Sequence, residues 1–428
     1  MLLHSLAARG SSRCEETTFS CLPKATTGLI SSTSLGSVST TPNYNAFGEV
    51  ETETATFGAN ALYSYALTRD AIGRINGKTE TVGGVTTSYA YTFDPAGRLT
   101  DVTKNGVAQS HYDYDSNSNR TGGHRNGVSF SATYDVQDRL LTYGTKSYTY
   151  NLNGDLTSKT DSATSTTTNY TYDVFGGLTQ VQLPTKTINY VIDGSGRRII
   201  RKIGTAIDKY YLYFGKRILA EVNPNGTMSR RYVYATKSHV PDYVIQGSSV
   251  FKVVTDHLGS VRMVVNIATG TIAQQIEYDE YGRVLSDTNP GFQAFGFAGG
   301  LYDHETKLVR FGARDYDAEV GRWTSKDPIL FAGGDTNLYG YVLQDPINFI
   351  DPDGKMSIAV GIIITVTVGP LSYWVWDNYF REEDALDELK RQIDQDRMRS
   401  KGGQCSPNAP PAPPRRPPPN TGPPHIPT

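Results

Sequence analysis

The sequence predicts an all-β protein, a ribbon of short β-hairpins that spirals into a shell or partial barrel. Two features of the composition point to strands and turns. The chain of 428 residues contains 28 Tyr and 42 Gly but only 5 Met. Aromatic residues favour pleated strands, and Gly supplies the positive φ angles of tight turns. A third observation is a short motif that recurs along most of the chain, with apolar and polar residues alternating beside its turns.

The segment 1–43 precedes this motif and is expected to be poorly ordered. Its first residues read MLLHSLAARGSSRCEETTFS and match no complete folding unit. They contain neither the basic leader nor the long apolar run of a signal peptide.

The recurring motif occupies residues 44–295 and consists of an aromatic residue, a polar step, Asp, a turn with Gly, and then Arg or Leu. The copies start about every twenty residues, as expected for hairpins with outer loops of variable length. They include YNAFGEV from Tyr44, YTFDPAGRLT from Tyr91, YNLNGDLTS from Tyr150, YVIDGSGRRI from Tyr190 and YDEYGRVL from Tyr278. Separate β-sandwiches with ordinary turns are the alternative, but they do not require the same residue order in every unit.

One unit shows how such a ribbon is stabilised. Around Tyr148 the residues alternate between apolar and polar, which is typical of a strand with one buried face. The sequence NGD at residues 153–155 favours a tight hairpin turn, because its central residues tolerate positive φ. A single hairpin is marginally stable and must bury its apolar face against its neighbours. Hairpins stacked side by side therefore form one continuous sheet that curls into a shell.

The segment 296–355 carries four longer motifs. They are GLYDHETKLVRFGARDYD from Gly300, GRWTSKDP from Gly321, GGDTNLYGYV from Gly333 and DPINFIDPDG from Asp345. Together with the repeats, they resemble the YD/RHS-repeat family, which includes teneurins and toxin-complex proteins, and this segment is similar to its RHS repeat-associated core. The resemblance covers roughly residues 44–355. It implies a hollow β-shell that encapsulates polypeptide and is closed by the core segment as a plug.

The resemblance also implies an aspartyl-type protease that cuts its own chain. By position, the catalytic carboxylates are Asp327 and Asp351, and Arg322 is the supporting cation. Such a pair shares one proton, so that one carboxylate acts as a base towards water while the other donates to the carbonyl oxygen. The alternative is that both Asp residues only start Asp-Pro turns, with Arg322 pairing a neighbouring carboxylate.

The cleavage site that the resemblance implies lies just after the DPxG motif, at Gly354, Lys355 and Met356. Two residues depart from the family pattern: Lys355 stands where Leu is usual, and Leu330 stands where the first motif usually has Gly. Cleavage at this site would release the C-terminal segment.

Beyond the core the chain changes character. Residues 356–376 carry no charge and end in aromatic residues, so the segment 356–380 is expected to be an apolar, transmembrane helix. The alternative is a hydrophobic segment that is held inside the shell. Apolar residues at helical spacing predict a charged amphipathic helix over 381–401. The Pro-rich residues 402–428 are expected to form a disordered tail.

Charge and cysteine content exclude several classes of function. The net charge is −2, so no broad basic surface for nucleic acid is expected. Cys14, Cys21 and Cys405 are far apart, which argues against a disulfide framework, and none of them stands at a short spacing from a histidine, as in zinc sites. We expect no metal and no cofactor.

Three functions fit these features: a container, a self-cleaving protease, and a membrane-anchored cell-surface protein of teneurin type. The expected cargo of the container is the chain's own C-terminal segment, which has the position of the family's variable effector region. The repeats are few for a closed cage, so a complementary shell-forming chain is a second expected partner. The membrane is a third, through residues 356–376, and the expected location is membrane-associated, secreted or at the cell surface.

Overall fold

The computed structural model describes residues 19–24, 27–355 and 358–359. All of them belong to one compact unit, Met1–Val368. Of the apolar helix expected over 356–380, the structure describes only Ile358–Ala359, and these two residues form a short strand instead of a helix. The rest of that segment, the amphipathic helix expected over 381–401 and the Pro-rich tail over 402–428 lie outside the described residues. No helix in the described part of the chain has the length and apolar character needed to cross a membrane.

The described residues are almost entirely β-strands and turns. The strands of the large sheet are β1 (Phe19–Pro23), β2 (Ile30–Leu35), β3 (Val38–Tyr44), β4 (Val50–Phe57), β5 (Asn60–Arg69), β6 (Ile75–Val82), β7 (Val85–Phe93), β8 (Leu99–Lys104), β9 (Val107–Tyr114), β10 (Arg120–Arg125), β11 (Val128–Tyr134), β12 (Leu140–Tyr143), β13 (Lys146–Tyr150), β14 (Leu156–Asp161), β15 (Thr166–Tyr172), β16 (Leu178–Gln182), β17 (Thr187–Ile192), β18 (Arg198–Ile203), β19 (Ala206–Phe214), β20 (Arg217–Val222), β21 (Met228–Val233), β22 (Tyr243–Gln246), β23 (Ser249–Thr255), β24 (Val261–Asn266), β25 (Ile272–Tyr278) and β26 (Val284–Asp287).

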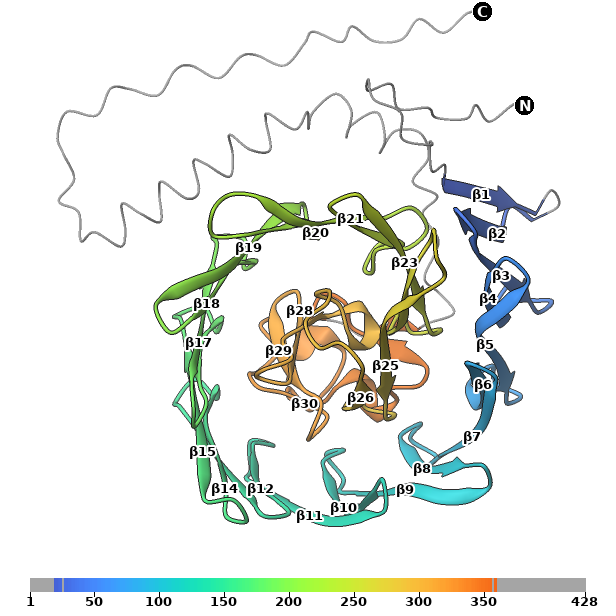
Figure 1. Cartoon of the computed structure of the whole chain (residues 1–428). Coiled ribbons are helices and arrows are strands. Elements are labelled where there is room, and N and C mark those ends of the chain that lie inside the picture. Colours follow the sequence, from blue (N-terminus) through green and yellow to red (C-terminus); the bar gives the residue numbers. More distant parts are fainter. Residues whose placement is uncertain (1–18, 25–26, 356–357, 360–428) are drawn as a thin grey trace, which may run out of the picture. The chain divides into compact units, whose positions relative to one another are not determined.

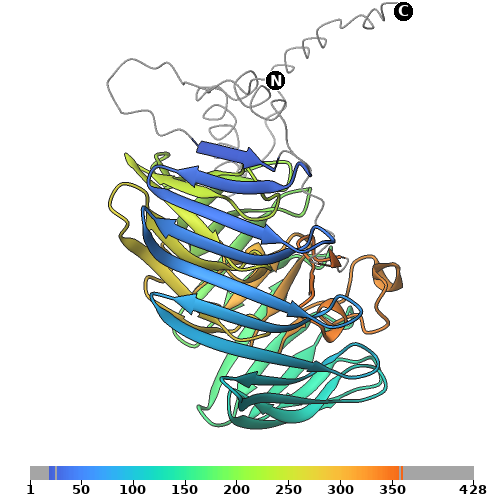
Figure 2. The ribbon, with the colours of Figure 1, turned by 90° about the vertical axis from the view of Figure 1, so that its right-hand side faces the viewer.

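These 26 strands form one antiparallel meander, in which each strand pairs with the next along the chain. Figure 2 shows the first strands, in blue, lying side by side. Among the described strands, β1 pairs only with β2 and β26 only with β25, so hydrogen bonds do not close the sheet into a barrel. The all-β hairpin shell is confirmed, in its partial, open form.

The shell starts earlier than the motif predicts. Strands β1 and β2 and most of β3 lie within the segment 1–43, for which poor order was expected. They lack the Asp-Gly turn that marks the later units, and a tight turn at Gly36, with a φ of 57°, joins β2 to β3. The pairing of β3 with β4 therefore continues the sheet into strands that lack the motif.

The Asp, Gly and Arg of the motif form a turn between two strands, and this turn recurs at the same end of successive hairpins. In the turn between β7 and β8, Oδ1 of Asp94 accepts the backbone N–H groups of Ala96 at 2.9 Å and Arg98 at 3.0 Å. Gly97 takes a φ of 86°, and Nε of Arg98 donates to Oδ2 of Asp94 at 2.7 Å. The same contacts recur in the turns that begin at Asp70, Asp135 and Asp193.

The segment after β26 lies inside the curve of the sheet, as Figure 1 shows. Its elements are η1 (Phe297–Gly299), β27 (Leu301–Tyr302), β28 (Leu308–Phe311), β29 (Arg314–Asp317), β30 (Arg322–Trp323), η2 (Leu330–Gly333), η3 (Val342–Gln344), β31 (Phe349–Ile350) and β32 (Ile358–Ala359). Strands β27 to β30 form a small antiparallel sheet, and β31 pairs with β32. We call residues 296–355 the inner segment and strands β1 to β22 the wall.

The hydrophobic core lies between the wall and the inner segment. Aromatic residues of the motif on the wall are buried in this core, among them Tyr91, Tyr148, Tyr170 and Tyr190. Leu308 and Val320 of the inner segment share one buried cluster with Leu140 and Tyr148 of the wall. The apolar face of the curled sheet is thus buried against the inner segment. A hairpin ribbon without this segment would leave the face exposed to water.

Candidate functional site

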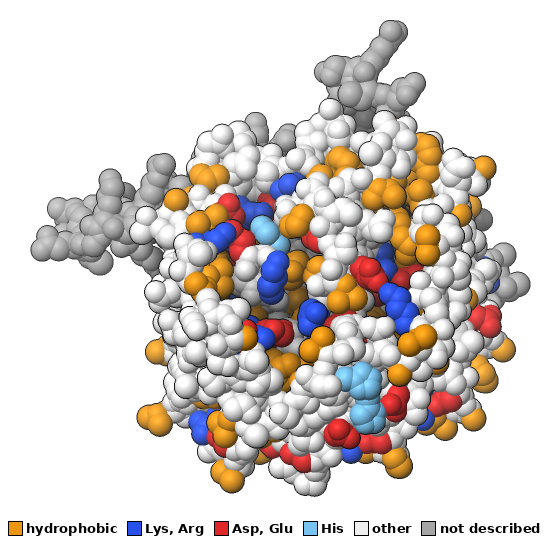
Figure 3. Space-filling model, turned by 60° about the horizontal axis from the view of Figure 1, so that its bottom comes forward, with side chains coloured by type: hydrophobic (Ala, Val, Ile, Leu, Met, Phe, Trp, Pro, Cys, Tyr) orange, Lys and Arg blue, Asp and Glu red, His pale blue; other side chains and the backbone are white. Residues whose placement is uncertain are grey.

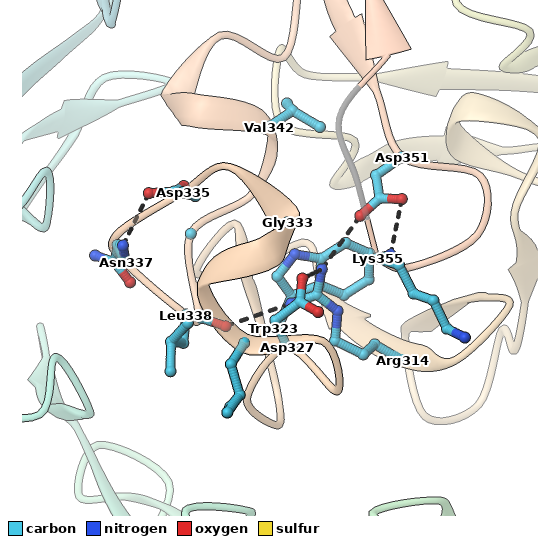
Figure 4. Close-up of a pocket in the computed structure, with 12 residues that line it drawn as sticks. Arg314, Trp323, Asp327, Gly333, Asp335, Asn337, Leu338, Val342, Asp351 and Lys355 are labelled. Carbon is cyan, nitrogen blue, oxygen red and sulfur yellow. Dashed lines mark hydrogen bonds and ion pairs between the residues drawn. The ribbon is translucent and has the colours of Figure 1, made fainter.

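Two carboxylates of the inner segment meet on one arginine. Arg314 begins β29, Asp327 follows β30 and Asp351 follows β31. Nη2 of Arg314 lies 2.8 Å from Oδ2 of Asp327 and 3.2 Å from Oδ2 of Asp351 (Figure 4). The fold therefore brings together Asp327 and Asp351, the two residues predicted as a carboxylate pair.

Each carboxylate also holds a local turn with its other oxygen. Oδ1 of Asp327 accepts the N–H of Ile329 at 2.9 Å, and Oδ1 of Asp351 accepts the N–H of Lys355 at 3.0 Å. Both Asp residues precede Pro, which cannot donate to them, so the first free N–H lies further along the chain. Each carboxylate thus uses one oxygen for its turn and the other for Arg314, so the turn contacts do not exclude a role as a catalytic pair.

Arg314 is held in place by two further hydrogen bonds and by the ring of Trp323. Its Nε donates to the carbonyl oxygen of Gly354 at 2.7 Å, and its Nη1 donates to that of Leu338 at 3.3 Å. The guanidinium lies over the ring of Trp323, with 4.1 Å between its central carbon and the ring centroid. Arg314 itself is buried. A planar cation with several donors suits this task, because it binds two carboxylates and a carbonyl in one plane.

The surroundings favour the protonated form of one carboxyl group. Burial raises the pKa of Asp327, the charge of Arg314 lowers it in part, and the nearby charge of Asp351 raises it again. Burial also lowers the pKa of Arg314, against the charges of Asp327 and Asp351. This environment therefore helps Asp327 to keep a proton.

Arg322, predicted as the supporting cation, lies elsewhere. Its Nη1 donates to Oδ1 of Asn119 at 2.9 Å, and its Nη2 donates to the carbonyl oxygen of Asp138 at 2.6 Å. Arg322 therefore ties the inner segment to two turns of the wall, and Arg314 takes the place beside the carboxylates. The sequence does not single out Arg314, because five residues of the stretch RFGARDYDAEV are charged and Arg310 is a second arginine among them. A buried charge in such a strand requires a partner.

A small cavity lies at the centre of this group. Its volume is about 10 Å³, and Arg314, Trp323, Asp327, Asp351 and Lys355 line it. That is about the space one water needs. The group combines two carboxylates, a guanidinium and a peptide segment with room for water, which is a set suited to hydrolysis of an amide. Within residues 19–24, 27–355 and 358–359, no three His, Cys, Asp or Glu side chains are arranged to hold a metal ion.

A second set of charges joins the inner segment to the wall. Nε of Arg201 lies 2.8 Å from Asp303, Nη2 of Arg198 lies 2.8 Å from Asp315, and Nζ of Lys159 lies 3.2 Å from Asp317. Lys146, Lys159 and Lys186 of the wall also pair with Glu305 and Glu319 of the inner segment. In each pair the wall supplies the cation and the inner segment the anion. Figure 3 shows charged side chains of both signs gathered around a hollow on one face.

Comparison with known proteins shows that most of this chain is similar to one family. A family model described as Teneurin YD-shell matches residues 17–347. Teneurin-3 of Danio rerio is 29% identical over 334 residues, which are 72% of this chain and 12% of that protein. Teneurin-3 of Mus musculus is 31% identical over 301 residues, covering 67% of this chain and 11% of its own length. The chain thus spans little more than a tenth of these curated relatives.

Among solved structures, the TcdB2-TccC3-Cdc42 crystal structure is similar over 79% of this chain and 24% of its own. Its sequence identity is 18% and the TM-score is 0.36.

Proposed function

The chain belongs to the teneurin YD-shell family, and from this premise we propose that it is a shell scaffold that encloses the start of its own C-terminal segment. The observation that carries the proposal is the place where the inner segment ends. The carbonyl of Gly354 and the N–H of Lys355 are both bound, by Arg314 and Asp351. The point from which the C-terminal segment leaves is therefore anchored inside the curve of the wall.

The ion pairs between wall and inner segment support the same function. A plug must be held by many contacts across its surface, because burial of a few apolar side chains alone gives little specificity of position. The buried pairs of Asp303, Asp315 and Asp317 with wall cations fix the position of the inner segment in the shell. Pairing of opposite charges specifies such a register, since a shifted arrangement leaves charges buried without partners.

Protease protection of the full-length chain tests the scaffold. Proteinase K digestion is followed by mass spectrometry. A container keeps fragments that extend beyond Lys355 for as long as residues 27–355 stay intact, and digestion in denaturant removes both together. Rapid trimming of the chain back to Lys355 around an intact shell would contradict enclosure and favour a displayed segment.

Self-cleavage is a second candidate function, favoured by the contacts of Asp327, Asp351 and Arg314. One carboxylate accepts a proton from a water in the cavity, the water adds to a peptide carbonyl, and a protonated carboxyl donates to the carbonyl oxygen. Arg314 stabilises the negative charge that develops there. The raised pKa of Asp327 supports the donor role for this residue.

The mass of the purified chain tests this second function. Self-cleavage predicts two fragments from the wild-type chain and a single full-length species from Asp327→Asn and from Asp351→Asn. Lys216→Ala is the control, since its pair with Asp353 is exposed and does not touch the carboxylates. Full-length wild-type protein that persists across a range of pH would contradict self-cleavage.

Partners and location extend the proposal. The open sheet leaves β1 with a free edge among the described strands, and an unpaired edge can be covered by another chain. A complementary shell-forming chain fits this edge. A secreted or cell-surface location fits the teneurin relatives, and attachment to a membrane through residues 356–376 stays a prediction from composition.

A further inference from the structure

Gly333 borders the cavity in which the two carboxylates meet. It ends η2, and Gly334 after it closes the helix with a φ of 86°. Gly334 needs its glycine for this left-handed conformation. The φ of Gly333 lies outside the left-handed region, so its backbone would accept any residue. The backbone conformation therefore does not explain why residue 333 is glycine, and a steric constraint from neighbouring atoms is the remaining explanation.

The space over Gly333 is taken by two oxygen atoms. A Cβ at this position would lie 2.8 Å from the carbonyl oxygen of Lys355 and 3.0 Å from Oδ2 of Asp327. Atoms of folded proteins do not approach this closely without a shift. The carbonyl of Lys355 and the carboxylate of Asp327 thus face the same small volume, and this volume exists because residue 333 is glycine.

The neighbouring peptide is held in a different way. The carbonyl of Gly354 accepts from Nε of Arg314 at 2.7 Å, and the N–H of Lys355 donates to Asp351 at 3.0 Å. Both polar groups of the Gly354–Lys355 peptide are therefore occupied by hydrogen bonds. These two contacts anchor the chain one residue before the carbonyl that faces Asp327.

We infer that Gly333 is a positioning residue that lets the carbonyl of Lys355 lie against Asp327 and so selects the Lys355–Met356 bond for cleavage. The inference rests on the self-cleavage proposed above. A water adds to the carbonyl carbon of Lys355 and gives a proton to a carboxylate. The carbon–nitrogen bond then breaks, and the nitrogen of Met356 leaves with a proton as a free amine. The products are residues 1–355, ending in a carboxylate, and residues 356–428.

The test compares Gly333→Ala with Gly334→Ala in the full-length chain. Gly333→Ala should slow cleavage about a hundredfold, because a shift of about 1 Å at a reacting carbonyl costs that much. Gly334→Ala puts a side chain into open space at a φ of 86°, so it should lower the melting temperature through backbone strain but leave the rate near that of the wild type. Rates come from intact mass over time, and the melting temperature from circular dichroism.

The outcomes separate the inference from the function on which it rests. A merely structural role for Gly333 predicts that cleavage falls in step with the melting temperature in both variants, and this result would overturn the inference. Equal rates for wild type and Gly333→Ala would also overturn it while leaving self-cleavage in place. Fragments that end at Gly354 would overturn the choice of bond. Full-length wild-type chain at all times would overturn self-cleavage itself.

If Gly333→Ala does not fold, the same substitution is compared in a chain that also carries Asp327→Ala. Removal of the Asp327 carboxylate relieves one of the two close contacts, so recovery of the fold, scored by trypsin resistance, supports the crowded volume. Failure to recover it would count against the inference.

Discussion

The carboxylate of Asp315 lies 2.8 Å from Nη2 of Arg198, and both side chains are almost completely buried between the wall and the inner segment. The second oxygen of Asp315 lies 2.7 Å from Nη1 of Arg310, on the neighbouring strand β28. One carboxylate of the inner segment thus neutralises a cation of the wall and a cation of its own sheet. The pair links the two layers at a point to which water has almost no access.

Removal of the Asp315 carboxylate should destabilise the whole unit. Asp315→Ala leaves two buried guanidinium groups without their anion, which costs about 3–5 kcal/mol. Urea unfolding followed by tryptophan fluorescence measures the loss. Lys216→Ala is the matched control, because its ion pair with Asp353 is exposed and should cost less than about 1 kcal/mol. Equal losses in the two variants would contradict the role assigned to the buried pair.

Asp303 should make the fold sensitive to acid. Burial alone would raise its pKa, but the hydrogen bonds and the charge of Arg201 outweigh burial and lower the pKa well below the ordinary value of 3.8. A group whose pKa is depressed by folding stabilises the protein fully above its unfolded pKa and loses that contribution as the pH falls towards its folded pKa. The free energy of unfolding should therefore decline from about pH 4 downwards.

The variant Asp303→Asn tests this dependence. Its free energy of unfolding should be lower than that of the wild type at neutral pH, and the two curves should converge below about pH 4, where the wild type loses the same contribution. Asp353→Asn, at an exposed site, should run parallel to the wild type. A constant difference between Asp303→Asn and the wild type down to pH 2 would be inconsistent with a lowered pKa.

The local parts of this fold follow from the sequence because their causes are local. The turn at Asp94 needs only an Asp, a Gly three positions later and an Arg after it, so a repeated motif predicts a repeated turn. Burial of Tyr148 follows from alternation along its own strand. Strands β1 and β2 contain no copy of the motif, so the motif does not predict them. They are strands because each pairs with the next strand of the sheet.

The site could be predicted only in part for the same reason. Asp327 and Asp351 stand in recurring Asp-Pro motifs, and the family resemblance indicates them. Whether Arg314 or Arg322 reaches them depends on the register of β29 against β30, where Asp317 pairs with Arg322 and Tyr316 with Trp323. That register directs Arg322 towards the wall. It follows from the packing of the whole inner segment, which no local pattern encodes.

Exchange of each arginine for lysine should separate their roles. Arg314→Lys keeps the charge but cannot hold two carboxylates and the Gly354 carbonyl at once, so self-cleavage should slow about a hundredfold. Arg322→Lys weakens contacts with the wall at Asn119 and Asp138 and should lower the melting temperature while cleavage continues. Intact mass and thermal melting measure the two effects. A larger loss of cleavage in Arg322→Lys would restore Arg322 as the supporting cation.

The wall should tolerate alanine in place of a glycine that only adopts a positive φ, and reject it in place of a glycine that lies against the backbone of the next strand. Gly97 has a φ of 86° with open space around it, so Gly97→Ala should cost about 1–2 kcal/mol of strain. Gly123, at a φ of 126° in β10, lies so close to the backbone of His111 in β9 that a Cβ would overlap its carbonyl group. Gly123→Ala must then break the pairing of β9 with β10 in the middle of the wall, and its cost should exceed that of Gly97→Ala by about 2 kcal/mol or more. Urea unfolding of the two variants measures the difference. Equal costs would mean that the ribbon can widen locally, and the close pairing at Gly123 would then not be a constraint on the sheet.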